Sequence, residues 1–178
     1  VIPMELIKAA VDRDVALSAS APIIWGLDVA RYGGDNSALC VRQGNTVLEL
    51  KSFQSMDLMQ LCGAIKNKYD DCTALERPQE ILIDVIGLGS GVVDRLAEQN
   101  LPVRGINVAE APATKKNYLN LRAELWFSIK DWLAQRDCRL PNDDELVSEL
   151  AAPIYKYTSS GKIKLESKEE MRKRGIKS

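Results

Sequence analysis

Apolar and polar residues follow two different periods along this chain, and the changes of period predict its elements. Residues 3–17 repeat apolar positions at helical spacing behind a proline, which is typical of the start of a helix. The small residues 18–22 interrupt that pattern and predict a linker. Residues 23–29 form an apolar run that predicts a buried strand, interrupted by Asp28 near its end.

The rest of the chain predicts a strand meander and then alternating strands and helices. Two further strands, over 37–42 and 46–53, are joined by a short polar turn. The elements expected after them are helices over 56–69, 92–99, 118–136, 143–150 and 167–174, strands over 80–85 and 102–108, and a hairpin over 154–157 and 162–165. This order is the ribonuclease H topology. The predicted fold class is therefore α/β, a ribonuclease H-like fold with a mixed central β-sheet flanked by helices.

The composition excludes several classes of enzyme. The 178 residues are 46% hydrophobic and 28% charged, which is enough apolar surface for a buried core. The sequence contains no histidine, so Ser-His-Asp and Cys-His hydrolases and HExxH metalloproteases are excluded. Its apolar runs are far shorter than the roughly 20 residues of a membrane span, and we expect a soluble, intracellular protein with no membrane partner. Any catalysis must use carboxylates, lysines or backbone groups.

The charged residues are unevenly distributed along the chain. The net charge is −1, yet residues 162–178 carry seven Lys or Arg against three Glu. This basic tail is either a solvated helix face or part of a surface that binds a polyanion.

The four cysteines fit no metal or redox spacing, and we predict that they are buried small hydrophobic residues.

Two aspartates stand at the ends of apolar strands. Asp28 closes the strand over 23–29 and Asp84 closes the strand over 80–85, and glycines follow both. A carboxylate at the end of a buried strand is costly unless a cation or hydrogen bonds compensate it. On two neighbouring central strands the pair would suit Mg²⁺, which prefers a few carboxylate oxygens and water. The alternative is that each aspartate caps a loop by accepting backbone N–H groups.

A glycine cluster follows the second aspartate. Residues 87–91, with the sequence GLGSG, precede a predicted helix. They can form either a tight strand-to-helix turn or a cradle for a phosphate, and no GxxxxGK[ST] motif supports the second interpretation.

Three segments in order carry a resemblance to a known family. They are WGLDVARYGGDNS over 25–37, IDVIGLGSGVVD over 83–94 and NYLNLRAELW over 117–126. Together they resemble the nuclease domain of the large terminase subunit of tailed bacteriophages or prophages. The resemblance covers residues 22–178, and residues 1–21 look like the helix and linker that connect that domain to an upstream ATPase domain.

The resemblance implies a metal-dependent endonuclease that cuts double-stranded DNA during viral genome packaging. Its cofactors would be two Mg²⁺ or Mn²⁺ ions, with no nucleotide in this domain. Its partners would be double-stranded DNA, the portal protein, the small terminase subunit and its own ATPase domain, in the cytoplasm of the bacterial host. A third metal-ligating aspartate is expected beyond Ser178.

The same resemblance assigns roles to individual acids. Asp28 and Asp84 fall on catalytic, metal-ligating positions of the family, with Asp28 contacting both ions and Asp84 one. Asp35 is a candidate for an outer position that holds a metal-bound water, or is a turn residue. Glu124 is a weaker candidate, because we expect a glutamate on a helix face to be solvated.

Cleavage at arbitrary sequences needs contacts to phosphates rather than to bases. The candidate DNA-binding residues are Arg31, Lys115, Lys116 and Arg122, together with the basic terminal helix.

Two other functions share the predicted topology. One is an actin-like or sugar-kinase-like ATPase domain, which also places aspartates at strand ends beside glycine turns. The other is a non-catalytic docking module of ribonuclease H fold, in which the acids only cap loops.

Overall fold

The computed structural model describes residues 1–30 and 36–176 of the 178-residue chain. The chain divides into two compact units. The sheet unit spans Ala16–Asn107, and the helical unit combines Val1–Val15 with Val108–Ser178. Among the described helices, none has both the length and the apolar character needed to cross a membrane.

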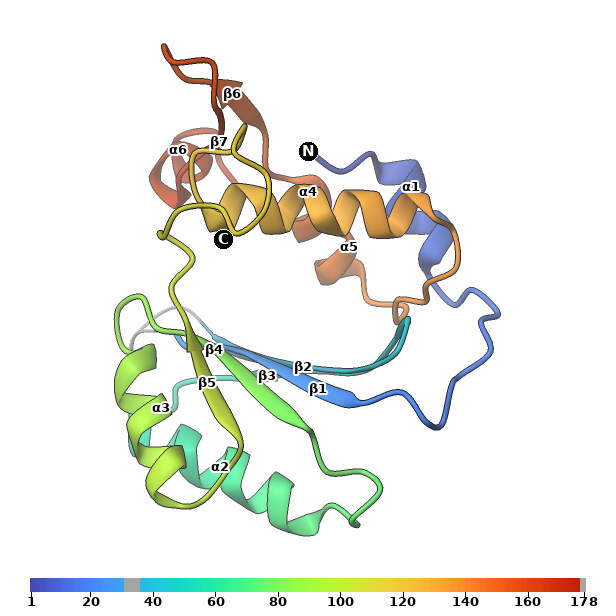
Figure 1. The fold of residues 1–178 in the computed structure, drawn as a ribbon, viewed down its shortest axis with the longest axis vertical. Coiled ribbons are helices and arrows are strands. Elements are labelled where there is room, and N and C mark those ends of the chain that lie inside the picture. The colour runs from blue at the N-terminus through green and yellow to red at the C-terminus, as the bar shows by residue number, and fades with distance from the viewer. Residues whose placement is uncertain (31–35, 177–178) are drawn as a thin grey trace. The chain divides into compact units, whose positions relative to one another are not determined.

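The sheet unit contains a five-stranded mixed sheet, which confirms the predicted fold class (Figure 1). Its strands are β1 (Ile23–Asp28), β2 (Ser37–Gln43), β3 (Thr46–Phe53), β4 (Glu80–Asp84) and β5 (Val103–Ile106), in the spatial order β3-β2-β1-β4-β5. The first three strands form the predicted antiparallel meander, and β4 pairs in parallel with both β1 and β5. Parallel pairing brings the carboxyl ends of β1 and β4 to the same edge of the sheet.

Two helices, α2 (Leu58–Asp71) and α3 (Gly89–Glu98), cover one face of this sheet (Figure 1). Helix α2 starts with a capping box, in which Asp57 accepts from the N–H of Gln60 and the Gln60 side chain accepts from the N–H of Asp57. The buried core under the helices comes from alternate strand residues and from one stripe of each helix, including Trp25, Leu27, Leu61, Ile65, Ile83, Val92 and Leu96. Alternation along each strand therefore leaves the intervening side chains on the opposite face.

The helical unit contains α1 (Met4–Ala10), α4 (Leu121–Ala134), α5 (Asp144–Ala151), the hairpin strands β6 (Tyr155–Tyr157) and β7 (Ile163–Leu165), and α6 (Lys168–Lys173). The first helix is held within this unit by backbone contacts. The ammonium group of Val1 donates to the carbonyl oxygen of Pro153 at 2.7 Å. The N–H of Leu140 donates to the carbonyl oxygen of Ala10 at 2.8 Å. Whether residues 1–21 connect to an upstream domain stays a prediction.

Most predicted boundaries are within two residues of the observed ones, but three helices differ more. Helix α3 starts at Gly89 instead of residue 92, so the end of the glycine cluster is helical. In the other two helices tertiary contacts take over the backbone. Helix α1 ends at Ala10, seven residues early, because Val11 is extended and bridges to Leu140, and Asp12 has a φ of 52°. Helix α4 starts at Leu121 instead of residue 118, because Tyr118 bridges to β7 at Ile163. The cysteine prediction is correct for Cys62 and Cys138, whereas Cys40 and Cys72 are half-buried, and all four thiols are free.

Candidate metal centre

Asp28 and Asp84 end two adjacent parallel strands. Leu27 of β1 lies in register with Ile83 of β4, and each aspartate is the next residue on its strand. Leu27 and Ile83 are buried in the core beneath α2 and α3. Because successive side chains of a strand point to opposite faces, both carboxylates lie on the face away from those helices, at one edge of the sheet. The structure therefore makes the two aspartates neighbours.

The two carboxylates have different surroundings. Asp28 is exposed, whereas Asp84 is half-buried. One oxygen of Asp84, Oδ1, accepts a hydrogen bond from the N–H of Ile86 at 3.0 Å, which is the loop-capping role considered from the sequence. A carboxylate has about four acceptor sites, so this bond orients Asp84 without using up its capacity to bind a cation.

The glycine cluster positions Asp84 through a close backbone approach. Gly89 is the first residue of α3, and a Cβ atom there would lie 1.7 Å from the carbonyl oxygen of Asp84. Gly87 has a φ of 78°, in the left-handed region that glycine adopts without strain. Both observations support a tight strand-to-helix turn, but the turn ends at Leu88 and residues 89–91 already belong to α3, which begins directly against the end of β4.

The donor set at this edge fits a hard divalent cation. Two carboxylates offer the oxygen ligands that Mg²⁺ and Mn²⁺ take, with the remaining positions left to water. Within residues 1–30 and 36–176, no group of three or more His, Cys, Asp or Glu side chains comes together as a metal site. Asp35 and Arg31, a candidate acid and a candidate DNA contact, lie outside the described residues.

The remaining candidate DNA-binding residues lie in the helical unit. Lys115 and Lys116 are exposed, and Lys115 Nζ lies 3.0 Å from Asp131 Oδ2, a hydrogen-bonded ion pair that raises the pKa of Lys115. Arg122 is half-buried and donates to the carbonyl oxygen of Glu166 at 2.9 Å. Arg122 therefore serves the packing of its own unit, whereas both lysines are exposed and Lys115 is held beside Asp131.

Glu124 is not solvated, which corrects the expectation from the sequence. Its side chain is only 4% exposed and accepts hydrogen bonds from the N–H groups of Ala113, Thr114 and Lys115 and from the Thr114 hydroxyl. The Thr114 hydroxyl above all, and then these backbone N–H groups, lower the pKa of Glu124. The carboxylate thus ties the segment 113–116, which carries the two lysines, to α4. No local pattern could have revealed this, because the donors lie about ten residues before the helix position that receives them.

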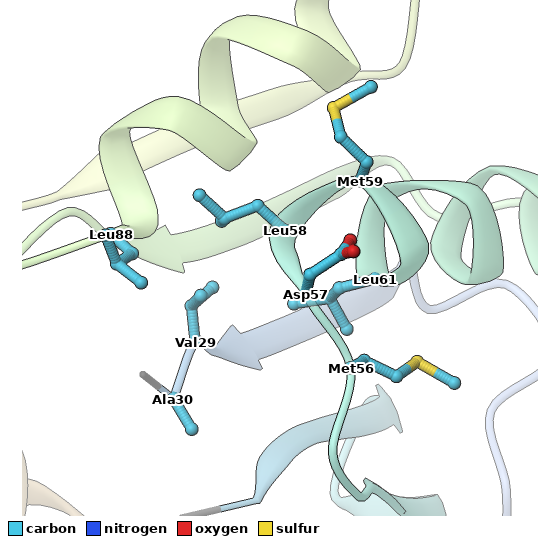
Figure 2. A pocket seen from close by; sticks show the side chains of 8 residues that line it. All are labelled: Val29, Ala30, Met56, Asp57, Leu58, Met59, Leu61 and Leu88. Atoms are coloured by element: carbon cyan, nitrogen blue, oxygen red, sulfur yellow. The ribbon is translucent and has the colours of Figure 1, made fainter. Parts of the chain in front are cut away.

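An apolar pocket of about 290 Å³ lies in the sheet unit between the end of β1 and the start of α2 (Figure 2). Its described lining residues contribute one carboxylate and no cation: Val29, Ala30, Met56, Asp57, Leu58, Met59, Leu61 and Leu88. The carboxylate belongs to Asp57, which caps α2. These residues offer no positively charged donor to the phosphates of a nucleotide.

The architecture matches solved structures of phage nucleases. The nuclease domain of the large terminase subunit gp2 of bacterial virus Sf6 aligns with a TM-score of 0.75 and 20% identity, over 98% of this chain and 91% of that chain. This chain has the fold of a large-terminase nuclease domain. A mutant of the same Sf6 domain, solved with manganese and beta-thujaplicinol, aligns with a TM-score of 0.78 and 19% identity over the same shares of the two chains.

A second phage gives the same result at lower identity. The large terminase nuclease from thermophilic phage G20c with bound magnesium aligns with a TM-score of 0.66 and 14% identity, over 92% of this chain and 86% of that chain. No protein-family model and no curated protein matches the sequence. The similarity therefore establishes the ribonuclease H-like fold, and the activity has to be argued from the residues.

Proposed function

We propose that this chain is the nuclease domain of a large terminase subunit, and that it cuts double-stranded DNA with divalent metal ions during viral genome packaging. The observation that carries the proposal is the register of β1 and β4, which makes Asp28 and Asp84 neighbours at the carboxyl ends of parallel strands. The chain also has the fold of nuclease domains that were solved with manganese and with magnesium.

Asp28 and Asp84 would hold the metal ions, two Mg²⁺ or Mn²⁺, with Asp28 contacting both and Asp84 one. Bound there, the ions would act as Lewis acids on the phosphodiester and lower the pKa of a bound water. Asp84 is held for this task by the N–H of Ile86 and by the start of α3 against its backbone. The chain has no histidine, and a carboxylate would accept the proton from the attacking water.

The remaining parts of the proposal concern the substrate and the assembly. Lys115 and Lys116, held on the segment that Glu124 binds, would contact DNA phosphates independently of sequence. Arg31 near Asp28, Asp35 as an outer partner of the metal, and a third carboxylate beyond Ser178 belong to the proposal through the family resemblance. So do the portal protein, the small terminase subunit and an ATPase domain as partners in the host cytoplasm.

The test compares Asp28→Asn and Asp84→Asn with Asp71→Asn, a control that removes an exposed carboxylate at the end of α2. The readouts are Mn²⁺ titration and nicking of supercoiled plasmid in Mn²⁺. Each of the first two variants should weaken Mn²⁺ binding and nicking about tenfold or more, since even an outer partner of a metal costs that much. The control should behave like the unchanged protein.

Full metal binding and nicking in both strand-end variants would contradict the assignment. Protection of the unchanged protein by ATP against proteolysis, without metal-dependent nicking, would instead favour the kinase-like ATPase. The absence of both nicking and nucleotide protection would favour the docking module.

A further inference from the structure

Four aromatic rings form a continuous ladder in the helical unit, from its core to its surface. The ring centroids of Tyr118 and Phe127 lie 5.2 Å apart, those of Phe127 and Tyr155 5.2 Å, and those of Tyr155 and Tyr157 6.0 Å. Exposure rises along the ladder, from 5% at Tyr118 to 44% at Tyr155 and 66% at Tyr157. The two outer rings share one face of β6 because they are two residues apart on a strand.

The hairpin that carries the outer rings, residues 155–165, projects from α4 (Figure 1). Packing against Phe127 accounts for the position of Tyr155, but Tyr157 is two-thirds exposed. A large aromatic side chain left mostly in water forgoes the stabilisation of burial and is enriched where a partner binds. Packing within the helical unit thus accounts for the inner rings of the ladder, whereas the outermost ring, Tyr157, is accessible to a ligand.

The surroundings of the ladder are cationic. Residues 154–176 carry seven Lys or Arg against three Glu, a net charge of +4. Lys156 and Lys164 lie directly opposite one another across the hairpin, on the face away from Tyr155 and Tyr157, an arrangement that destabilises a strand pair. Glu170 pairs with Lys156 and offsets part of that cost. Lys130 lies over the Phe127 ring, 5.6 Å from its centroid. This charge is complementary to a polyanion.

Rings and cations together select among polyanions. Aromatic side chains beside lysines bind nucleic acid by stacking on bases while the cations contact the flanking phosphates. Inside a duplex the faces of the bases are covered by their neighbours, so a ring can stack only on a single strand or on the terminal base of a duplex. Cleavage of duplex DNA produces such ends.

We infer that the 155–165 hairpin binds the end of cut DNA, with Tyr157 stacked on a terminal or unpaired base, while the net positive charge of residues 154–176 and Lys130 beside Phe127 attract its phosphates. The inference rests on the proposed nuclease function and deepens it, because it assigns a site that retains the product end. The Tyr155 ring contacts Tyr157 and itself packs on Phe127, so Tyr155 and Phe127 are positioning residues.

The test measures DNA binding in EDTA, where no metal-dependent cleavage occurs. A fluorescein-labelled 12-nucleotide single strand reports binding by anisotropy, and two competitors are compared at equal base pairs: a blunt 20-base-pair duplex and a relaxed, covalently closed circular plasmid, which has no ends. The unchanged protein should prefer the short linear duplex. Tyr157→Ser should weaken binding of the single strand and of the linear duplex about fivefold or more, the effect of losing one stacked base, and leave the circle unaffected.

Two further variants separate stacking from general effects. Tyr157→Phe keeps the ring and should restore the affinity for ends. Leu75→Ser removes a side chain that is 92% exposed in the sheet unit, and should bind all three DNAs like the unchanged protein.

Each other outcome overturns the inference. Equal competition by the linear duplex and the circle, or equal weakening of both by Tyr157→Ser, would show that ends are not recognised. Unchanged DNA affinity in Tyr157→Ser would assign the exposed rings to a protein partner instead. These results are independent of the nuclease assignment, which fails only if Asp28 and Asp84 prove dispensable for metal-dependent nicking.

Discussion

Gly89, the first residue of α3, lies directly against the carbonyl group of Asp84, the last residue of β4. The helix can start there only because position 89 has no Cβ atom. The strand-end aspartate is therefore fixed from two sides: its side chain accepts from Ile86, and its backbone packs against the helix start.

Gly89→Ala should destabilise the protein by about 3 kcal/mol or more, the upper end of the cost of overpacking, because the obstacle is backbone that cannot rotate away. Urea unfolding measures this change. Gly63→Ala is the matched control, since Gly63 lies exposed within α2 with open space around it. It should stabilise the protein by roughly 1 kcal/mol through helix propensity. A neutral Gly89→Ala would show that β4 and α3 are further apart than described.

Asp28→Asn and Asp84→Asn should not add in their effect on nicking. Both carboxylates serve one site in the proposed function, so the double variant should lose no more activity than the more impaired single variant. The melting temperature without metal should stay the same or rise, because one of two neighbouring negative charges is removed and, in Asp84→Asn, the new amide oxygen can still accept from Ile86. A further loss in the double variant, measured by plasmid nicking, would place the two residues in separate sites.

Glu124→Gln should release the segment 113–116 while the helices stay folded. The N–H groups of Ala113, Thr114 and Lys115 now share the two carboxylate oxygens of Glu124, and a glutamine side chain has only one acceptor oxygen. Its NH₂ group would also face these N–H groups, donor against donor. Hydrogen exchange at the amides of Ala113, Thr114 and Lys115 should therefore become faster than in the unchanged protein. Exchange in α2 serves as the internal control, and unchanged protection at 113–115 would contradict the role assigned to Glu124.

Acid should weaken the hairpin of the helical unit. Hydrogen bonds from Lys156 and from the Ser167 N–H lower the pKa of Glu170 from its usual 4.5 to about 2. Since the folded-state pKa is depressed, the stabilisation is present above pH 4.5 and is lost as the pH falls from 4.5 towards 2. Glu124 and Glu166, whose pKa values are also lowered, contribute in the same direction.

Melting temperatures measured across that pH range check this expectation. In Glu170→Gln the melting temperature should fall less on acidification than in the unchanged protein. High salt should reduce this difference between the two proteins, because the Lys156–Glu170 pair is at the surface. Glu169→Gln, at the exposed neighbouring position of α6, is the matched variant and should leave the curve as it is. An identical acid side in Glu170→Gln would contradict the assigned contacts.

The sequence alone determined the order of the strands and helices and the two aspartates that interrupt apolar strands. These features are local: a period of two or of 3.6 residues, or a charge inside an apolar run, is visible within a few positions. It also determined the fold class, because the order of elements restricts the possible topologies.

Only the tertiary structure decided which residues meet across long stretches of chain. The register of Leu27 with Ile83 made Asp28 and Asp84 neighbours, although 56 positions separate the two aspartates. Burial of Glu124 depended on N–H groups from another segment, and the early end of α1 on Leu140. The aromatic ladder joins residues from 118 to 157. Such contacts depend on packing between distant elements, which a local pattern does not encode.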